Sequence, residues 1–117
     1  MSQAPDARAR RPGPPRHELP VIDAAALDAA RSVDRTILAC RAIGADRWVR
    51  YLEPIPDALR DAPIGELRSV ALRARAAIGP KDSILEILGP DVTVPLRDAI
   101  DGLLRLLARE AARPGGQ

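Results

Sequence analysis

The sequence predicts an all-α fold, and three observations support this prediction. The stretch from Thr93 to Arg113 places its large apolar residues on one arc of a helix drawn at about 100° per residue, with most of its charged residues opposite. No stretch alternates apolar and polar residues with the two-residue period of a strand over any length. The hydrophobic content is 46% but aromatic residues make up only 2%, so the core must be aliphatic. We therefore expect a small helical bundle of three main helices plus one or two short helices.

The first twenty residues are predicted to form a disordered, Arg/Pro-rich N-terminal arm. Residues 1–20 contain five prolines and almost nothing apolar, so the segment cannot bury enough surface to offset the entropy lost on ordering. Its net charge equals the +2 of the whole chain, and the positive charges come from Arg8, Arg10, Arg11 and Arg16. The expected organisation continues with a helical bundle domain over residues 21–113 and a flexible C-terminus over residues 114–117.

The first long helix is predicted to start after Asp23, a good N-cap residue. Helical periodicity then continues to about residue 52, with one inward arc that includes Cys40. A competing interpretation ends this helix at Gly44 and begins a new one at Asp46, because glycine commonly follows a helix and aspartate commonly caps one. We favour one continuous helix over residues 24–52.

A second, thinner apolar stripe follows the same predicted helix. Leu27, Leu38 and Val49 recur every eleven residues, a spacing that keeps one face of a nearly straight helix. Trp48 and Tyr51, the only aromatic residues of the chain, lie near its end, and such residues are favoured anchors of interfaces. They are also the obvious residues to fill the core. Two stripes indicate burial on two sides, so we expect these five residues to contact a partner chain.

The remaining helices are bounded by proline and glycine. One helical turn is predicted over Asp57–Ala62, a longer helix over Ile64–Ile78, and a short helix over Ile84–Leu88. Thr93 is expected to cap the last helix, with Pro95 in its first turn, where proline removes no helical hydrogen bond.

Three basic residues form a candidate anion-binding site. Arg68 and Arg75 are seven residues apart, so they share one helix face, and Lys81 lies in the loop that leads to a short helix. Guanidinium groups and free backbone N–H groups at a helix start both attract anions. The simpler interpretation is that the arginines lie over an apolar edge and reach water.

The sequence offers no catalytic, cofactor-binding or metal-binding pattern. Cys40 is the only thiol and His17 the only imidazole. Cys40 falls on the inward arc, where a cysteine behaves as a small apolar residue, and no cluster of Cys or His provides soft metal ligands. We expect no cofactor, and an enzyme is less expected than a binding protein.

Apolar surface and charge suggest a function. No run of about twenty apolar residues predicts a membrane span, and a single cysteine allows no internal disulfide, so we expect a cytoplasmic protein. The arginine- and alanine-rich composition suggests a bacterial source. We expect a non-enzymatic helical protein–protein interaction module, either a homodimer or a subunit of a larger assembly. The alternative is a small DNA-associated regulator that binds phosphates weakly through its basic N-terminal arm.

Overall fold

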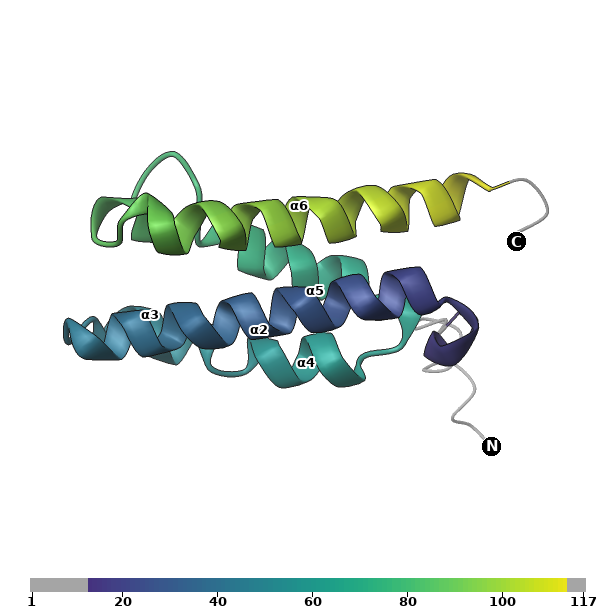
Figure 1. Cartoon of the computed structure of the whole chain (residues 1–117), viewed down its shortest axis with the longest axis horizontal. Coiled ribbons are helices and arrows are strands. Elements are labelled where there is room, and N and C mark those ends of the chain that lie inside the picture. The colour runs from purple at the N-terminus through teal and green to yellow at the C-terminus, as the bar shows by residue number, and fades with distance from the viewer. Residues whose placement is uncertain (1–12, 114–117) are drawn as a thin grey trace, which may run out of the picture.

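The computed structural model describes residues 13–113, and every regular element in that range is helical (Figure 1). Five α-helices and two short 3₁₀ turns make up the described part of the chain, which contains no strand. The elements are η1 (Arg16–Glu18), α2 (Pro20–Ala42), α3 (Asp46–Leu52), α4 (Ile55–Asp61), α5 (Ile64–Ala76), η2 (Ile84–Glu86) and α6 (Pro90–Ala112). The predicted all-α fold is confirmed, including three long helices.

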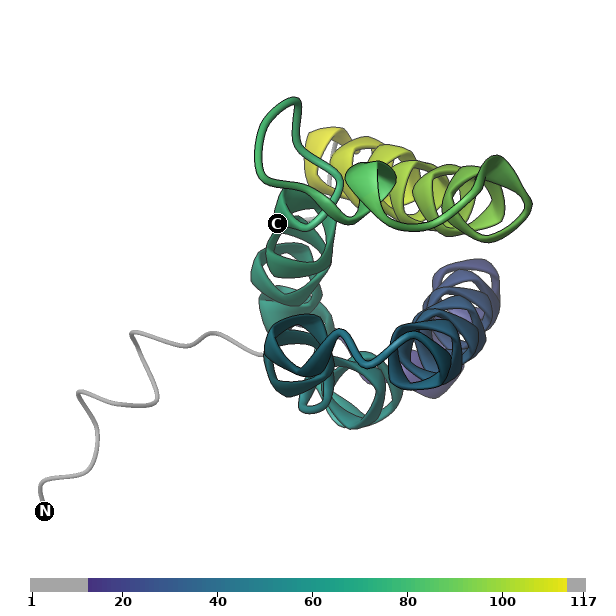
Figure 2. The ribbon, with the colours of Figure 1, turned by 90° about the vertical axis from the view of Figure 1, so that its left-hand side faces the viewer.

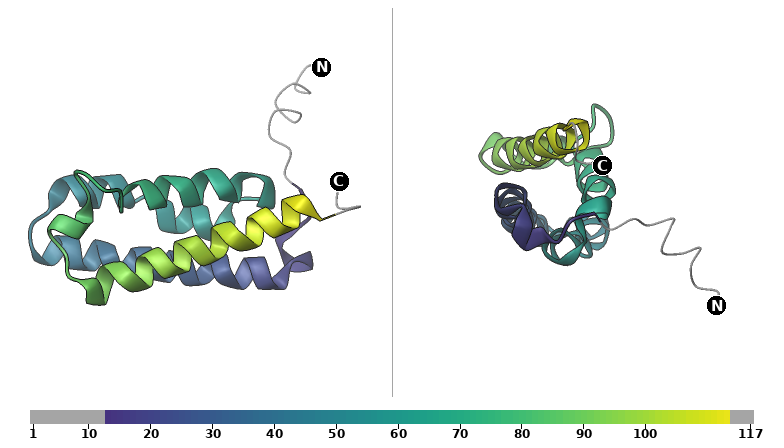
Figure 3. Two further views of the ribbon diagram at one scale, coloured as in Figure 1. Left: turned by 90° about the horizontal axis from the view of Figure 1, so that it is seen from above. Right: turned by 90° about the vertical axis from the view of Figure 1, so that its right-hand side faces the viewer.

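The helices form an up-and-down bundle with four legs. α2, α5 and α6 are single legs, whereas the second leg consists of α3 followed by α4. Viewed end-on, the four legs surround one core (Figure 2). α2 contacts both α6 and α4, and α5 contacts α4 and α6, so each leg packs between two neighbours. α2 and α6 run in opposite directions, and the start of α2 lies beside the end of α6 (Figures 1 and 3).

The long helix predicted over residues 24–52 is interrupted, so our preferred interpretation was wrong. Gly44 has a φ of +72°, a left-handed conformation that favours glycine. Its N–H donates to the Arg41 carbonyl at 3.1 Å, and the Ala45 N–H donates to the Cys40 carbonyl at 2.9 Å. This pair of hydrogen bonds is the Schellman motif, which ends a helix by satisfying its last carbonyls. A new helix, α3, then starts at Asp46.

The start of the first helix also differs from the prediction. α2 begins at Pro20 rather than after Asp23, because proline fits the first turn of a helix. Asp23 does not cap the helix; its carboxylate instead accepts a hydrogen bond from Arg16 Nε at 2.8 Å.

Residues 13–20 are ordered and pack on the bundle, which corrects the predicted boundary of the arm at residue 20. The Arg16 Nη1 donates to the carbonyls of Leu59 and Ala62, at 2.8 and 2.9 Å. A Cβ added at Gly13 would lie 3.4 Å from the Ile64 Cβ, so this segment covers the corner between α4 and α5. The rest of the predicted arm, residues 1–12, lies outside the described residues, as does the C-terminus over residues 114–117.

The last helix starts earlier than predicted. Gly89 is its N-cap residue and Pro90 its first residue. Thr93, the predicted cap, lies inside the helix and donates its hydroxyl to the Gly89 carbonyl at 3.2 Å. Pro95 therefore lies one turn deeper than predicted, where its missing N–H leaves the Asp91 carbonyl without its usual helical partner.

The core is aliphatic, as the composition requires. α6 contributes large side chains and α2 contributes several small ones.

The predicted short helix over Ile84–Leu88 is a single 3₁₀ turn whose start is capped by the Ser83 hydroxyl, which accepts from the Leu85 N–H at 3.2 Å. No helix among residues 13–113 combines the length and apolar character that a membrane-spanning segment needs.

Candidate functional site

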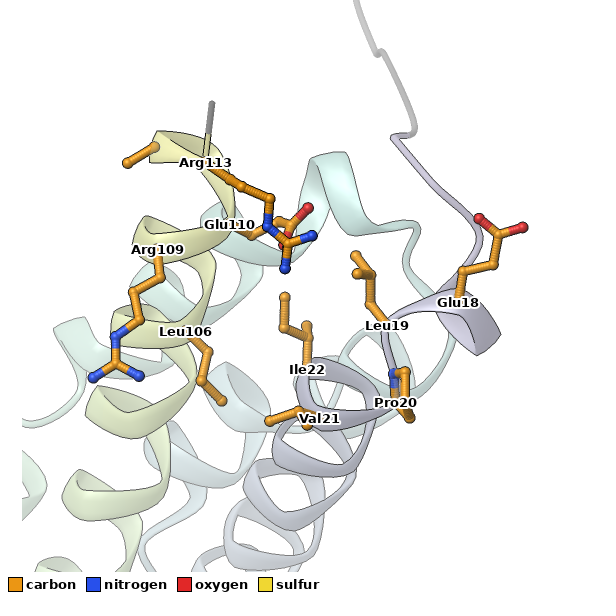
Figure 4. A pocket seen from close by; sticks show the side chains of 10 residues that line it. Glu18, Leu19, Pro20, Val21, Ile22, Leu106, Arg109, Glu110 and Arg113 are labelled. Atoms are coloured by element: carbon orange, nitrogen blue, oxygen red, sulfur yellow. The ribbon is translucent and has the colours of Figure 1, made fainter. Parts of the chain in front are cut away.

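A cleft of about 600 Å³ opens where α2 begins and α6 ends (Figure 4). Leu19, Val21 and Ile22 line it from the α2 side, and Leu106 and Ala112 line it from α6. The cleft exists because the two helices run antiparallel, so the first turn of α2 and the last turns of α6 project aliphatic side chains at the same end of the bundle. Val21 is 65% exposed. The cleft therefore places apolar side chains in contact with solvent.

Four charged residues surround these apolar side chains. Arg113 and Glu110 form an ion pair at 3.3 Å, one turn apart on the same stretch of chain. Glu18 and Arg109 also line the cleft, are exposed, and form no ion pair with any residue of the described chain. The rim therefore carries one uncompensated charge of each sign.

The cleft continues along the seam between α2 and α6 as a second groove of about 370 Å³. Ala25 and Asp28 line this groove from α2, and Gly102 lines it from α6. Leu106 and Arg109 line both spaces, so the groove adjoins the cleft.

The predicted interface stripe of Leu27, Leu38 and Val49 does not exist as one face. The break at Gly44 rotates α3 away from the axis of α2, and Val49 is buried at 8% exposure. Val49 is therefore not available to a partner chain. Leu38 is 63% exposed and borders a groove between α2 and α4, whereas Leu27 is half-buried.

Trp48 and Tyr51 lie together on α3, as adjacent turns of a helix require. Their ring centres are 5.8 Å apart and the rings are nearly perpendicular, at 81°, a favourable edge-to-face arrangement. The Tyr51 hydroxyl donates to the Arg73 carbonyl at 2.7 Å and so satisfies one of the last carbonyls of α5. Trp48 packs against the core but remains half-buried.

The three candidate anion-binding residues differ in their surroundings. Arg75 Nε binds the Asp101 carboxylate at 2.9 Å, and its Nη1 donates to the Ile78 carbonyl at 3.1 Å. Arg75 thus links α5 to α6 and is not free for an added anion. Arg68 and Lys81 are exposed.

Two further side chains of the described chain, Arg60 and Cys40, have structural roles. Arg60 connects α4 to α2 through Asp34, and this hydrogen bond raises the pKa of the Arg60 guanidinium. Cys40 is fully buried in α2, and burial raises the pKa of its thiol. Within residues 13–113, no group of three or more His, Cys, Asp or Glu side chains is arranged to hold a metal ion.

Sequence reasoning did not identify the cleft. It assigned Leu19 to the disordered arm and placed Leu106 on the buried arc of the last helix. The available signal was the apolar run Leu19–Ile22, which contains Pro20. Proline favours the first turn of a helix, so this residue could have indicated that the helix starts there. The pairing of that first turn with the last turn of α6 depends on the fold and has no sequence signature.

No known protein family, curated protein or solved structure matches this chain.

Proposed function

We propose that this protein is a non-enzymatic helical interaction module that forms a homodimer through the cleft between α2 and α6. The observation that carries the proposal is the apolar cleft with the 65%-exposed Val21 at its edge. Burying an aliphatic side chain of this size contributes roughly 1.5–3 kcal/mol, so exposed aliphatic residues grouped around a cleft favour association. The charges around the cleft support a second copy of this chain as its occupant.

A twofold dimer needs a surface that complements itself, because the same patch is used by both subunits. The rim of the cleft meets this requirement with the uncompensated Glu18 and Arg109. In a dimer, Glu18 of one subunit would face Arg109 of the other, while Val21 of each would enter the opposite cleft.

The test is the oligomeric state of the purified full chain by light scattering over a range of concentrations. The variant Val21→Asp should shift the protein to a monomer, because dimerisation would bury an unpaired carboxylate. Circular dichroism should stay unchanged, since Val21 is exposed in the single subunit.

The matched control is Leu38→Asp, which places the same charge at a comparably exposed leucine on another face of α2. This variant should remain dimeric. A wild-type protein that stays monomeric at high concentration would refute the proposal. A dimer that Leu38→Asp dissociates and Val21→Asp does not would place the interface on the outer face of α2 and reject the cleft.

The alternative function is a small DNA-associated regulator that uses the basic arm. Its support is the arginine content of residues 1–12, namely Arg8, Arg10 and Arg11. Arg16 is bound to Asp23 and two backbone carbonyls, so it adds little to a free arm. Deleting residues 1–12 should remove salt-dependent binding to duplex DNA, and unchanged binding after the deletion would exclude the arm as the contact.

A further inference from the structure

The second distinctive surface of the molecule is a groove of about 560 Å³ beside α3. Arg47, Trp48, Arg50 and Tyr51 line it from α3, and Ala76 lines it from the last turn of α5. Both aromatic residues of the chain are therefore on one small surface, together with two arginines. This groove is separate from the cleft between α2 and α6.

The aromatic rings of the groove are held in fixed positions. The Arg47 guanidinium carbon lies 4.7 Å from the centre of the Trp48 ring, a cation–π distance. The edge of one ring meets the face of the other, and the Tyr51 hydroxyl is anchored to the Arg73 carbonyl. A ligand that stacks here would meet rings that are already ordered, which reduces the entropy lost on binding.

The arginines of the groove belong to the eight of the fourteen described arginines that form no ion pair with a carboxylate. Arg16, Arg31, Arg41, Arg60, Arg75 and Arg113 each pair with a carboxylate. Arg47 and Arg50 are exposed and form no ion pair within residues 13–113. Asp46 is the only acidic residue of α3 and lies at its first turn, while Glu53, just after the helix, is bound to Arg41. The groove therefore carries uncompensated positive charge beside the exposed Tyr51 ring and the half-buried Trp48 ring.

We propose that the α3 groove binds single-stranded nucleic acid. Proteins that bind single strands combine aromatic side chains, on which bases stack, with positive charge along the phosphate backbone. A base would stack on Trp48 in place of the Arg47 guanidinium, which now lies over that ring, and the displaced Arg47 would join Arg50 in contacting the flanking phosphates. An acidic peptide would match the charge but would leave the aromatic rings without stacking partners. The proposal does not depend on the homodimer or on the N-terminal arm.

The site contains its own reporter, because Trp48 is the only tryptophan of the chain. The experiment titrates the full-length protein with an oligothymidylate of about 16 nucleotides, within the range of known single-strand site sizes. Quenching of Trp48 fluorescence measures stacking, and the anisotropy of an end-labelled oligonucleotide measures binding independently. The same titration with polyglutamate tests an acidic polymer.

The expected results separate stacking from charge. Trp48→Leu should weaken the affinity for the oligonucleotide roughly 5- to 150-fold, the range for loss of one stacked base. Arg47→Ala with Arg50→Ala should weaken binding and also reduce its dependence on salt, because about two phosphate contacts are lost. The double variant alters only exposed side chains, so it remains informative if Trp48→Leu fails to fold.

The matched control is Arg35→Ala with Arg105→Ala, which removes two exposed arginines from α2 and α6. This control, the deletion of residues 1–12 and the dimer variant Val21→Asp should all bind like the wild type. Absence of oligonucleotide binding, or wild-type affinity in both groove variants, would overturn the proposal. Quenching of Trp48 by polyglutamate as strong as that by oligothymidylate would overturn it in favour of an acidic protein partner.

Discussion

The two longest helices of the described chain, α2 and α6, are both 23 residues long, but they bury side chains of different size. The buried residues of α2 are mostly small, including Ala26, Ala29, Ala30 and Ser32. Those of α6 are mostly large, including Leu96, Ile100, Leu103 and Leu107. A helix with small buried residues lets its neighbours approach closely, whereas a helix with large ones fills the space between them.

Both helices pack between two neighbours, so the difference lies in the size of their buried side chains and not in the number of helices that cover them. α2 packs against α3 and α4 on one side and α6 on the other, so both of its sides are covered by helices. α6 packs along α2 and α5 and keeps a charged face toward solvent. The comparison teaches that the second apolar stripe predicted for the first helix does not mark a neighbour, because Leu38 remains 63% exposed and Val49 belongs to α3.

The largest expected effect is the loss of a large side chain from α6. Leu103 is fully buried, so Leu103→Ala should reduce the free energy of unfolding by about 2–5 kcal/mol through lost burial and the cavity left behind. Urea denaturation measures this change. Leu104→Ala, which truncates the half-buried neighbour on the same helix, should cost clearly less. Equal losses would contradict the assignment of the α6 core face.

Enlarging a small buried side chain tests the close packing of α2. Ala29 has no exposed surface, so Ala29→Leu should destabilise the protein by about 1–3 kcal/mol because the added methyl groups have no space. Ala24→Leu, on the exposed side of α2, should change stability by no more than about 0.5 kcal/mol. If Ala29→Leu left the stability to heat and urea unchanged, this result would contradict the close packing of α2.

Replacing either of two glycines by alanine sharpens the comparison, because the two substitutions should change the free energy of unfolding in opposite directions. Gly44 ends α2 with a φ of +72°, so Gly44→Ala should cost roughly 1–2 kcal/mol. Gly102 lies inside α6, and an added Cβ there would meet only Arg105 at 3.8 Å. Gly102→Ala should therefore stabilise the protein by up to about 1 kcal/mol. A stabilising Gly44→Ala would restore the continuous helix that the structure excludes.

The smallest effect concerns the thiol buried in α2. Burial raises the pKa of Cys40 above its ordinary value of 9.0, so the folded state retains a proton that the unfolded state releases. The contribution to stability is complete below the ordinary pKa and is lost as the pH rises through the raised one. In urea titrations at alkaline pH, the wild type should therefore lose more stability than Cys40→Ala. Identical pH profiles would show that the folded protein does not bury this thiol.

Much of the bundle could be predicted because the helical pattern is local. The arc of Leu96, Ile100, Leu103 and Leu107 is buried as its spacing indicates, and so is the Val33–Cys40 arc of α2. The bounds were less accurate because local signals compete. Gly44 was read as part of a continuous arc, yet its left-handed conformation turns the chain and leaves Ile43 54% exposed.

Of the candidate site residues, Trp48 and Tyr51 are together on α3 because sequence spacing fixes neighbours on one helix. The surroundings of Val49 and Arg75 could not be predicted from neighbours on one helix. Burial of Val49 and the bond between Arg75 and Asp101 depend on legs that are distant in the sequence.

The sequence by itself determined that the chain is helical, that its core is aliphatic, and which faces of its last helix avoid water, because periodicity and composition act within one helix. Only the tertiary structure decided that the start of α2 meets the end of α6 to form a cleft, and that Ala76 of α5 lines the groove beside α3. The physical reason is that contacts between legs depend on the turns that reverse the chain. At Gly44 a single left-handed residue decides where α3 points.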